Sequence, residues 1–366
     1  MKNSNMIRKR LLHLILIPVL LQMLGGCSHA KENSPGVVLS EFIFEEAPFA
    51  QCHASTIAET KHGLVAAWFG GTRESEPDVG IWLSRRGSSG WSPVEKVADG
   101  SELSGRKVAC WNPVLFQPKS GPLMLFYKVG DDEPEWWGEY KTSGDSGKTW
   151  SKPVRLPDGF LGPIKNKPIQ LPDGSILSPS SIEYYRKNRE VWQVHLERSE
   201  DMGQTWEKIG PLNEGKKINA IQPSILIYPD GMMQILCRTE RAGRICQAWS
   251  HNMGQTWSEM SLTTLPNPDA GTDAVMLNDG KALLVYNHST SNREFLNVAV
   301  SKDGKKWYAA LVLENQQGEY SYPAVIQTSD GLVHVSYTWK RRRIKHVVLD
   351  PTKFKLKEIH NGKWPK

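Results

Sequence analysis

Short hydrophobic runs alternate with polar turns along most of the chain. The runs are rich in β-branched and aromatic residues and occur at residues 64–68, 79–84, 123–127, 221–227, 233–238, 282–286, 296–300 and 332–337. Asp-Gly pairs, which favour tight hairpin turns, punctuate them at 173–174, 230–231, 279–280 and 330–331. Long helical periodicity is absent from the sequence. The pattern therefore predicts an all-β fold of short antiparallel strands.

One turn sequence, Ser-x-Asp/Asn-x-Gly-x-Thr-Trp, occurs three times, at residues 143–150, 199–206 and 250–257. A shortened copy lies at 301–307 and a degenerate one at 84–91. The Trp residues that close the copies are 59, 56, 51 and 50 residues apart. Repeats of this period indicate a propeller or an array. In each copy we expect Asp or Asn to accept bonds from backbone N–H groups, Gly to adopt positive φ and Trp to pack between sheets.

The period also predicts the number of blades. About 330 residues divided by this repeat give roughly six units. We therefore expect residues 37–366 to form one domain, a six-bladed β-propeller of four-stranded antiparallel blades, because ring closure leaves few open edges. Five blades carry a marked turn. The sixth is expected to be built from both ends of the chain, with residues 41–44 or their neighbours pairing with 346–349.

The N-terminus has the layout of an export signal. Four basic residues precede an apolar run at 11–24, and the sequence Leu-Gly-Gly-Cys ends at Cys27. This resembles a bacterial lipobox, so we expect a signal peptide at 1–26, lipidation of Cys27 and a tether at 27–36. A transmembrane anchor is disfavoured because the run is short and contains Pro18. The predicted location is the bacterial outer membrane or periplasm, with membrane contact only through the lipid.

The net charge of the chain bears on whether it binds nucleic acid. The whole chain has 45 basic and 39 acidic residues. Removal of 1–26 takes away four basic residues, so the mature net charge is 41 − 39 = +2. Nucleic-acid binding is therefore not expected, and the basic run at 340–343 is interpreted as a solvated turn.

The remaining cysteines are Cys52, Cys110, Cys237 and Cys246, and their spacing does not suit a zinc site. Disulfides and buried free thiols both stay open as possibilities. We predict a monomer without metal or cofactor.

Polar residues near predicted strand ends are the candidates for chemistry, because propellers bind ligands where loops converge. These residues are His53, Arg73, Glu74, Asp78, Asn112, Gln222, Arg238, Arg293, Glu319 and Tyr320.

The repeated turns resemble the Asp-boxes of the sialidase (neuraminidase) superfamily, and the similarity extends over nearly all of the mature chain. It implies that Arg73, Arg238 and Arg293 bind a substrate carboxylate, with Asn112 and Gln222 beside them. It also implies that the nucleophile is Tyr320, in the sequence Glu319-Tyr-Ser. Glu74 is the expected general acid; Asp78 is the alternative, unless it bonds the turn. The Asp-box residues themselves are expected to be structural.

This set of residue types suits an acidic sugar. Guanidinium groups bind carboxylates bidentately, and a neutral Tyr avoids the repulsion that a carboxylate nucleophile would meet there. Tyr then needs a neighbouring base or cations to react at neutral pH.

Two positions depart from the superfamily pattern. The first strand reads Gln-Cys-His-Ala-Ser at 51–55, without the Arg expected there, and Gln222 replaces the Glu that activates the Tyr. We therefore expect ordinary sialosides to be poor substrates. An anionic sugar whose carboxylate reaches His53 would be better.

Three functions follow as hypotheses. The first is an exported retaining exo-glycosidase that removes a terminal acidic sugar, sialic acid or a related one. The second is a propeller glycosidase or lyase that uses His53 on uronic-acid or rhamnose-type plant or algal glycans. The third is a non-catalytic glycan-binding lipoprotein.

Overall fold

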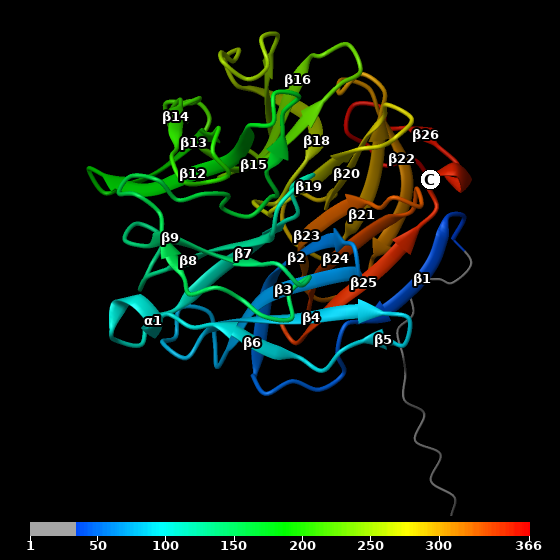
Figure 1. The fold of residues 1–366 in the computed structure, drawn as a ribbon. Helices are drawn as coiled ribbons and strands as arrows, with labels where there is room; N and C mark the ends of the chain where they lie inside the picture. The colour runs from blue at the N-terminus through cyan, green and yellow to red at the C-terminus, as the bar shows by residue number, and fades with distance from the viewer. Residues whose placement is uncertain (1–33) are drawn as a thin grey trace, which may run out of the picture.

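A computed structural model describes residues 34–366, which form six antiparallel sheets arranged around one axis (Figure 1). The predicted all-β six-bladed propeller is confirmed. The predicted signal peptide and the lipidated Cys27 lie outside the described residues.

The blades follow one another in chain order. Blade 1 contains β2 (Gln51–Thr60), β3 (Gly63–Gly71), β4 (Gly80–Gly87), β5 (Gly90–Trp91) and β6 (Glu95–Ala98). Blade 2 contains β7 (Cys110–Phe116), β8 (Leu123–Val129), β9 (Trp137–Ser143) and β10 (Val154–Arg155). Blade 3 contains β11 (Ile169–Gln170), β12 (Ile176–Arg186), β13 (Arg189–Ser199) and β14 (Glu207–Ile209).

The second half of the chain continues the ring. Blade 4 contains β15 (Ala220–Ile227), β16 (Met233–Thr239), β17 (Arg244–Ser250) and β18 (Ser261–Pro266). Blade 5 contains β19 (Asp273–Met276), β20 (Ala282–Asn287), β21 (Leu296–Ser301), β22 (Trp307–Glu314) and the added edge strand β26 (Lys357–Glu358). Blade 6 contains β23 (Tyr320–Gln327), β24 (Val333–Trp339), β25 (Arg343–Leu349) and β1 (Val37–Phe42). Two short helical turns, α1 (Ser101–Ser104) and η1 (Pro351–Lys353), lie in connections.

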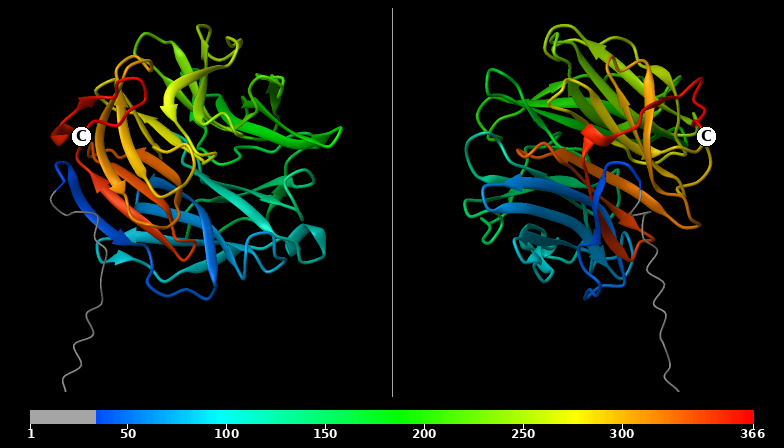
Figure 2. Two further views of the ribbon diagram at one scale, coloured as in Figure 1. Left: turned by 180° about the vertical axis from the view of Figure 1, so that it is seen from behind. Right: turned by 90° about the vertical axis from the view of Figure 1, so that its right-hand side faces the viewer.

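The two ends of the described chain close the ring, as expected. Strand β1 pairs with β25, and Glu41 lies opposite His346 in the ladder. The two strands run side by side in both views of Figure 2, although they are separated by almost the whole sequence. The last blade is therefore held by hydrogen bonds between the beginning and the end of the fold.

The Asp-box turns connect the third and fourth strands of blades 2 to 5, and they form the expected bonds. In the first copy, the Asp145 carboxylate accepts the backbone N–H of Thr149 at 2.8 Å and its hydroxyl at 2.6 Å. The Gly147 N–H donates to the Ser143 hydroxyl at 2.8 Å. Gly147 has a φ of 82°, which glycine adopts without a steric penalty. These turns are structural elements at the end of the blades opposite the site described below.

Four innermost strands share a backbone irregularity that positions the site. Ala54, Asn112, Gln222 and Tyr322 have φ values of 56°, 38°, 58° and 51°. Each lies in a register shift between an inner strand and its neighbour. Such bulges change the direction in which a side chain points. In each of these four blades the bulge redirects one residue. All four bulges lie at the end of the ring where the second and third strands of a blade are connected.

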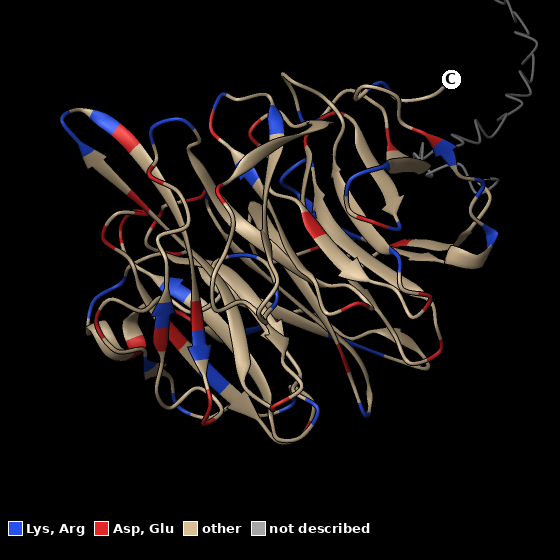
Figure 3. Ribbon diagram, turned by 90° about the horizontal axis from the view of Figure 1, so that it is seen from above, with Lys and Arg blue, Asp and Glu red and all other residues tan. Residues whose placement is uncertain are grey.

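The surface carries mixed charge. Lys and Arg are interspersed with Asp and Glu in Figure 3. Residues 34–366 include no helix that is long and apolar enough to cross a membrane. The cysteines at 52, 110, 237 and 246 are buried free thiols.

Candidate functional site

Tyr322 lies at the centre of the candidate site. Its phenol oxygen accepts an N–H from Arg238 at 2.5 Å and one from the Gln222 amide at 3.3 Å. The guanidinium carbons of Arg238 and Arg293 lie 5.7 and 5.8 Å from the ring centroid. Tyr322 is partly exposed, so a ligand can reach it. Because both recorded partners are donors, they stabilise negative charge on the phenol oxygen.

Tyr320, which the sequence analysis selected as nucleophile, lies elsewhere. Its side chain is 1% exposed and packs in the hydrophobic core between blades 5 and 6, against Trp339. Its hydroxyl contacts the Gln317 carbonyl at 3.5 Å. The bulge at Tyr322 separates the two tyrosines: Tyr320 pairs regularly with Trp339, and Tyr322 turns toward the guanidinium groups. The repeated polar-residue–Pro pairs at 112–113, 222–223 and 322–323 were the sequence signal for Tyr322.

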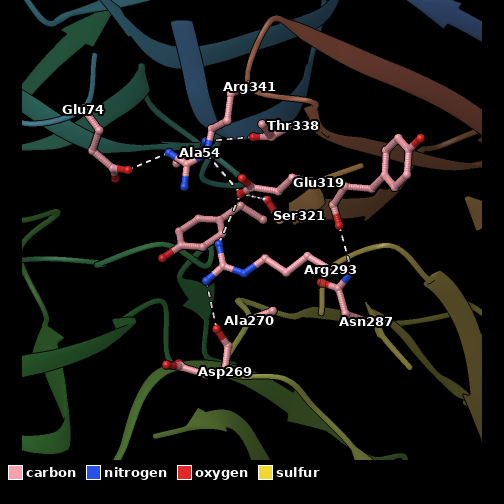
Figure 4. A network of polar contacts seen from close by, with 12 residues as sticks. Ala54, Glu74, Asp269, Ala270, Asn287, Arg293, Glu319, Ser321, Thr338 and Arg341 are labelled. Carbon is pink, nitrogen blue, oxygen red and sulfur yellow. Dashed lines mark hydrogen bonds and ion pairs between the residues drawn. The ribbon is translucent and has the colours of Figure 1, made fainter. Parts of the chain in front are cut away.

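Three arginines from blades 4, 5 and 6 surround this tyrosine. Arg238, 8% exposed, donates to the Asp269 carboxylate at 2.9 Å. Arg293 donates to Glu319 at 3.2 Å and to the Asp269 carbonyl at 2.9 Å. Arg341, from the β24–β25 turn, donates to the same Glu319 oxygen at 3.0 Å (Figure 4). The predicted residues Arg238, Arg293 and Glu319 are thus brought together, and Arg341 joins them.

The sequence analysis missed Arg341 because it belongs to the basic run at 340–343, interpreted there as a solvated turn. Its side chain is only 25% exposed and forms a 2.5 Å ion pair with Glu74, as well as the bond to Glu319. Burial works to raise the pKa of Glu319. The charge of Arg341, the Ser321 hydroxyl and Arg293 outweigh it and lower that pKa. Glu319 is therefore ionised at neutral pH and orients both arginines.

The loop that follows β3 contributes one residue to the site. Glu74, from blade 1, forms an ion pair with Arg341, from blade 6 (Figure 4). The Arg73 side chain is 70% exposed and pairs with Glu76 at 2.7 Å, outside the arginine cluster. Asp78 accepts the backbone N–H and the hydroxyl of Thr72 at 2.9 and 2.8 Å. Asp78 thus fastens the turn, which was the alternative reading of this residue.

His53 forms the wall of the site on blade 1. It is 1% exposed, its ring centroid lies 4.1 Å from that of Tyr322, and its Nδ1 atom has no hydrogen-bond partner. Burial lowers the pKa of His53 well below its ordinary value, and the surrounding cations, Arg341 first, lower it further. His53 is therefore neutral at pH 7 and able to accept a proton only against strong electrostatic opposition.

A buried lysine from the segment before β11 supports the site. Lys165 donates to the carbonyls of Pro323 at 2.5 Å and Thr272 at 3.0 Å, and to the Asn166 side chain at 2.8 Å. The Asn166 amide in turn donates to the Gln222 carbonyl at 3.0 Å. Burial, partly offset by Asp273, lowers the pKa of Lys165 to about 7. Blade 3 thus fixes the backbone on either side of the Gln222 and Tyr322 bulges.

The Gln222 side chain lies where a base for Tyr322 would have to be. Its amide oxygen accepts from Arg238 at 3.3 Å, and its amide nitrogen donates to Tyr322 at the same distance. It therefore orients the two reactive groups but cannot remove a proton. Asn112, also buried, occupies the corresponding bulge of blade 2. Among the described residues, no group of three or more His, Cys, Asp and Glu side chains is placed to hold a metal.

Comparisons with known proteins agree with this architecture. Residues 62–335 match the BNR repeat-like domain family. A protein of unknown function from Dyadobacter fermentans has a TM-score of 0.71 at 20% identity, covering 86% of this chain and 98% of that one. A Hadza microbial sialidase gives 0.72 at 19% identity, covering 87% and 69%. A point mutant of the NanB sialidase from Streptococcus pneumoniae gives 0.67 at 14% identity, covering 88% and 71%.

A search of curated proteins found no match. At these identities the structural similarities establish the fold alone, whereas the family match covers well over half of the chain. The expected resemblance to the Asp-box superfamily is confirmed at that level. The chain belongs to the family of proteins with a BNR repeat-like domain, and its six-bladed fold is the one found in sialidases.

Proposed function

We propose that this protein is an exported exo-glycosidase that removes a terminal acidic sugar, sialic acid or a related keto-sugar acid, from a glycan. The observation that carries the proposal is the cluster of Arg238, Arg293 and Arg341 around a partly exposed Tyr322. A Trypanosoma rangeli sialidase with the same fold has been solved with sialic acid bound. That likeness supports an acidic sugar as the ligand class.

In this proposal the three guanidinium groups bind the substrate carboxylate. A carboxylate accepts two parallel N–H bonds from each suitably oriented guanidinium, so the cluster fixes both position and orientation. Arg341 comes from blade 6 and takes the place of the Arg that the first strand lacks, beside His53. With three guanidinium groups available, the missing Arg of the first strand no longer argues that sialosides are poor substrates. The replacement of the Tyr-activating Glu by Gln222 still does, and kcat/KM on a sialoside would test it.

Tyr322 is the proposed nucleophile. Its oxygen accepts hydrogen bonds from Arg238 and Gln222, and the proposed attacking species is the phenolate. Arg238 and Gln222 stabilise that anion, which replaces activation by a carboxylate base. The Tyr322 oxygen attacks the anomeric carbon, and water later releases the sugar with retained configuration.

The decisive comparison is between Tyr322→Phe and its matched control, Tyr320→Phe. We expect Tyr322→Phe to lose most kcat on aryl glycosides of acidic sugars. Tyr320→Phe should retain activity, because its hydroxyl makes only a 3.5 Å contact in the core. Both variants should be checked by thermal unfolding. Full activity of Tyr322→Phe would exclude this mechanism.

A second candidate function rests on His53. A neutral, buried imidazole with an unpaired Nδ1 lies against Tyr322, and arginines are present to neutralise a uronate carboxylate. A bound uronate carboxylate would offset those cations, so that His53 could take the proton in a β-elimination on a uronic-acid or rhamnose-type glycan. A lyase leaves an unsaturated sugar that absorbs in the ultraviolet, whereas a hydrolase does not. Saturable glycan binding without either product would favour the non-catalytic alternative.

A further inference from the structure

Strand β12 presents one face of blade 3 to the site. The Ser181 hydroxyl on this strand accepts the Gln222 N–H at 3.3 Å. Glu183 follows two residues later and therefore projects from the same face. Its ladder partner is Trp192, whose ring lies 4.9 Å from the Arg238 guanidinium. The Glu183 side chain thus lies on the blade 3 side of the site, close enough to Arg238 for that charge to act on it.

Glu183 differs from the other carboxyl groups of the site in its bonding. Glu74 is bound by Arg341, and Glu319 by Arg293 and Arg341. Within residues 34–366, the Glu183 carboxyl makes no hydrogen bond or ion pair. A carboxylate held by a guanidinium is a poor proton donor, because the ion pair favours its ionised form. The unpaired group is better suited to carry a proton.

Burial favours the protonated form of Glu183. Burial raises the pKa of Glu183 to about 7; Arg238 opposes the rise, and the carboxyl groups of Glu133, Glu190 and Asp269 add to it. A general acid works best when its pKa is close to the operating pH.

We propose that Glu183 is the general acid of this site, and that Glu74 holds Arg341 in place instead of transferring the proton. The proposal rests on the glycosidase function above and deepens it. It also replaces the role that the sequence analysis gave to Glu74.

The reaction balances in two steps. In the first, the Tyr322 phenolate forms a bond to the anomeric carbon while the glycosidic C–O bond breaks. The electron pair of that bond stays on the leaving oxygen, which takes the Glu183 proton and departs as an alcohol. In the second, water attacks the anomeric carbon and gives one proton to the Glu183 carboxylate. The Tyr322–carbon bond then breaks, and its electron pair returns to the phenol oxygen.

The test uses leaving groups of different basicity. Two glycosides of one acidic sugar are compared, one with a 4-nitrophenyl and one with a galactosyl leaving group. A 4-nitrophenolate leaves without protonation, so only the galactoside needs the acid. We expect Glu183→Gln to lose 10²- to 10⁴-fold in kcat/KM on the galactoside and less than about tenfold on the aryl glycoside. Glu74→Gln should lose equally on both substrates, because it loosens Arg341.

Two further measurements keep the result interpretable. Glu183→Asp retains a carboxyl group and should recover part of the galactoside activity if Glu183→Gln folds poorly. The wild-type kcat/KM on the galactoside should fall above about pH 7, where Glu183 loses its proton. The kcat/KM on the aryl glycoside should show no such fall.

Each outcome decides a different statement. Equal losses of Glu183→Gln on both substrates, with Tyr322→Phe inactive, would overturn the role of Glu183 and leave the glycosidase. If Glu74→Gln showed the leaving-group dependence instead, Glu74 would be the acid. If the wild type cleaved neither substrate, the glycosidase function would fail, and the role of Glu183 with it.

Discussion

Protonation of a histidine pair at the ring closure should make the fold sensitive to acid. His334 Nδ1 contacts His346 Nε2 at 2.9 Å, and His346 Nδ1 contacts the Glu41 carboxylate at 2.9 Å. The carboxylate requires a hydrogen on His346 Nδ1, so His346 Nε2 must accept from His334. A second proton on His346 would place two N–H groups against each other. The chain of bonds therefore requires a neutral His346, whereas a proton added to His334 Nε2 leaves both bonds intact and is opposed by burial.

The structure gives the size of the effect. Burial first and the neighbouring His346 second lower the pKa of His334 from 6.5 to about 4. The unfolded chain binds this proton near pH 6.5, so stability is lost as the pH falls from 6.5 toward 4. At pH 5 the difference between the folded and unfolded pKa values is worth about 2 kcal/mol. Glu41, with its pKa lowered to about 2, remains ionised in the folded protein at that pH.

Urea unfolding at pH 8, 6.5 and 5, followed by tryptophan fluorescence, measures the loss. We expect His334→Asn, whose amide nitrogen replaces Nδ1 as the donor to His346, to be less stable at pH 8 and to lose about 2 kcal/mol less than the wild type between pH 8 and 5. The matched control is His62→Asn, at an exposed residue of the β2–β3 turn, which should keep the wild-type dependence. An unchanged pH dependence in His334→Asn would refute the reasoning.

Three further expectations follow from particular contacts. Arg341→Met should lower kcat/KM about ten- to a hundredfold, the effect of losing one charge-assisted bond, whereas Arg73→Met should leave kcat/KM unchanged; equal effects would contradict the placement of these residues. Gly304→Ala should destabilise by about 1–3 kcal/mol in thermal unfolding, because an added Cβ would lie 2.4 Å from two polar side-chain atoms; Gly144→Ala, with nothing within 4 Å, is its control. Cys27→Ser should release a soluble, folded protein, and recovery of that variant in detergent-extracted membranes would contradict lipidation.

The architecture could be predicted because it depends on local and repeated signals. Asp145 and its equivalents bond within their own turns, so the turn is specified by adjacent residues wherever it occurs. The spacing of the closing Trp residues then fixes the number of blades. The pairing of β1 with β25 followed from the need to close the ring, not from any feature of either strand.

The site could be predicted only in part, because it depends on how strands are displaced relative to one another. Simple alternation places Tyr320 and Tyr322 on one face of β23. The bulge between Ser321 and Ala324 breaks that alternation, and the resemblance to Glu-Tyr-Ser pointed to the tyrosine that is packed in the core. Arg341 was missed because a surface turn and a turn into a pocket have the same composition. Only the neighbouring Glu74 and Glu319 distinguish them.

The four inner-strand bulges are structurally equivalent positions, one in each of four blades. Ala54, Asn112, Gln222 and Tyr322 belong to different blades but share one backbone conformation, which is held by the ladders on either side. A replacement at one of them changes the chemistry offered to a ligand while the ladder hydrogen bonds stay in place. The left-handed conformation restricts the choice, since β-branched residues fit it poorly. Engineering of this propeller toward other ligands should therefore begin at these four residues, with unbranched polar or aromatic side chains.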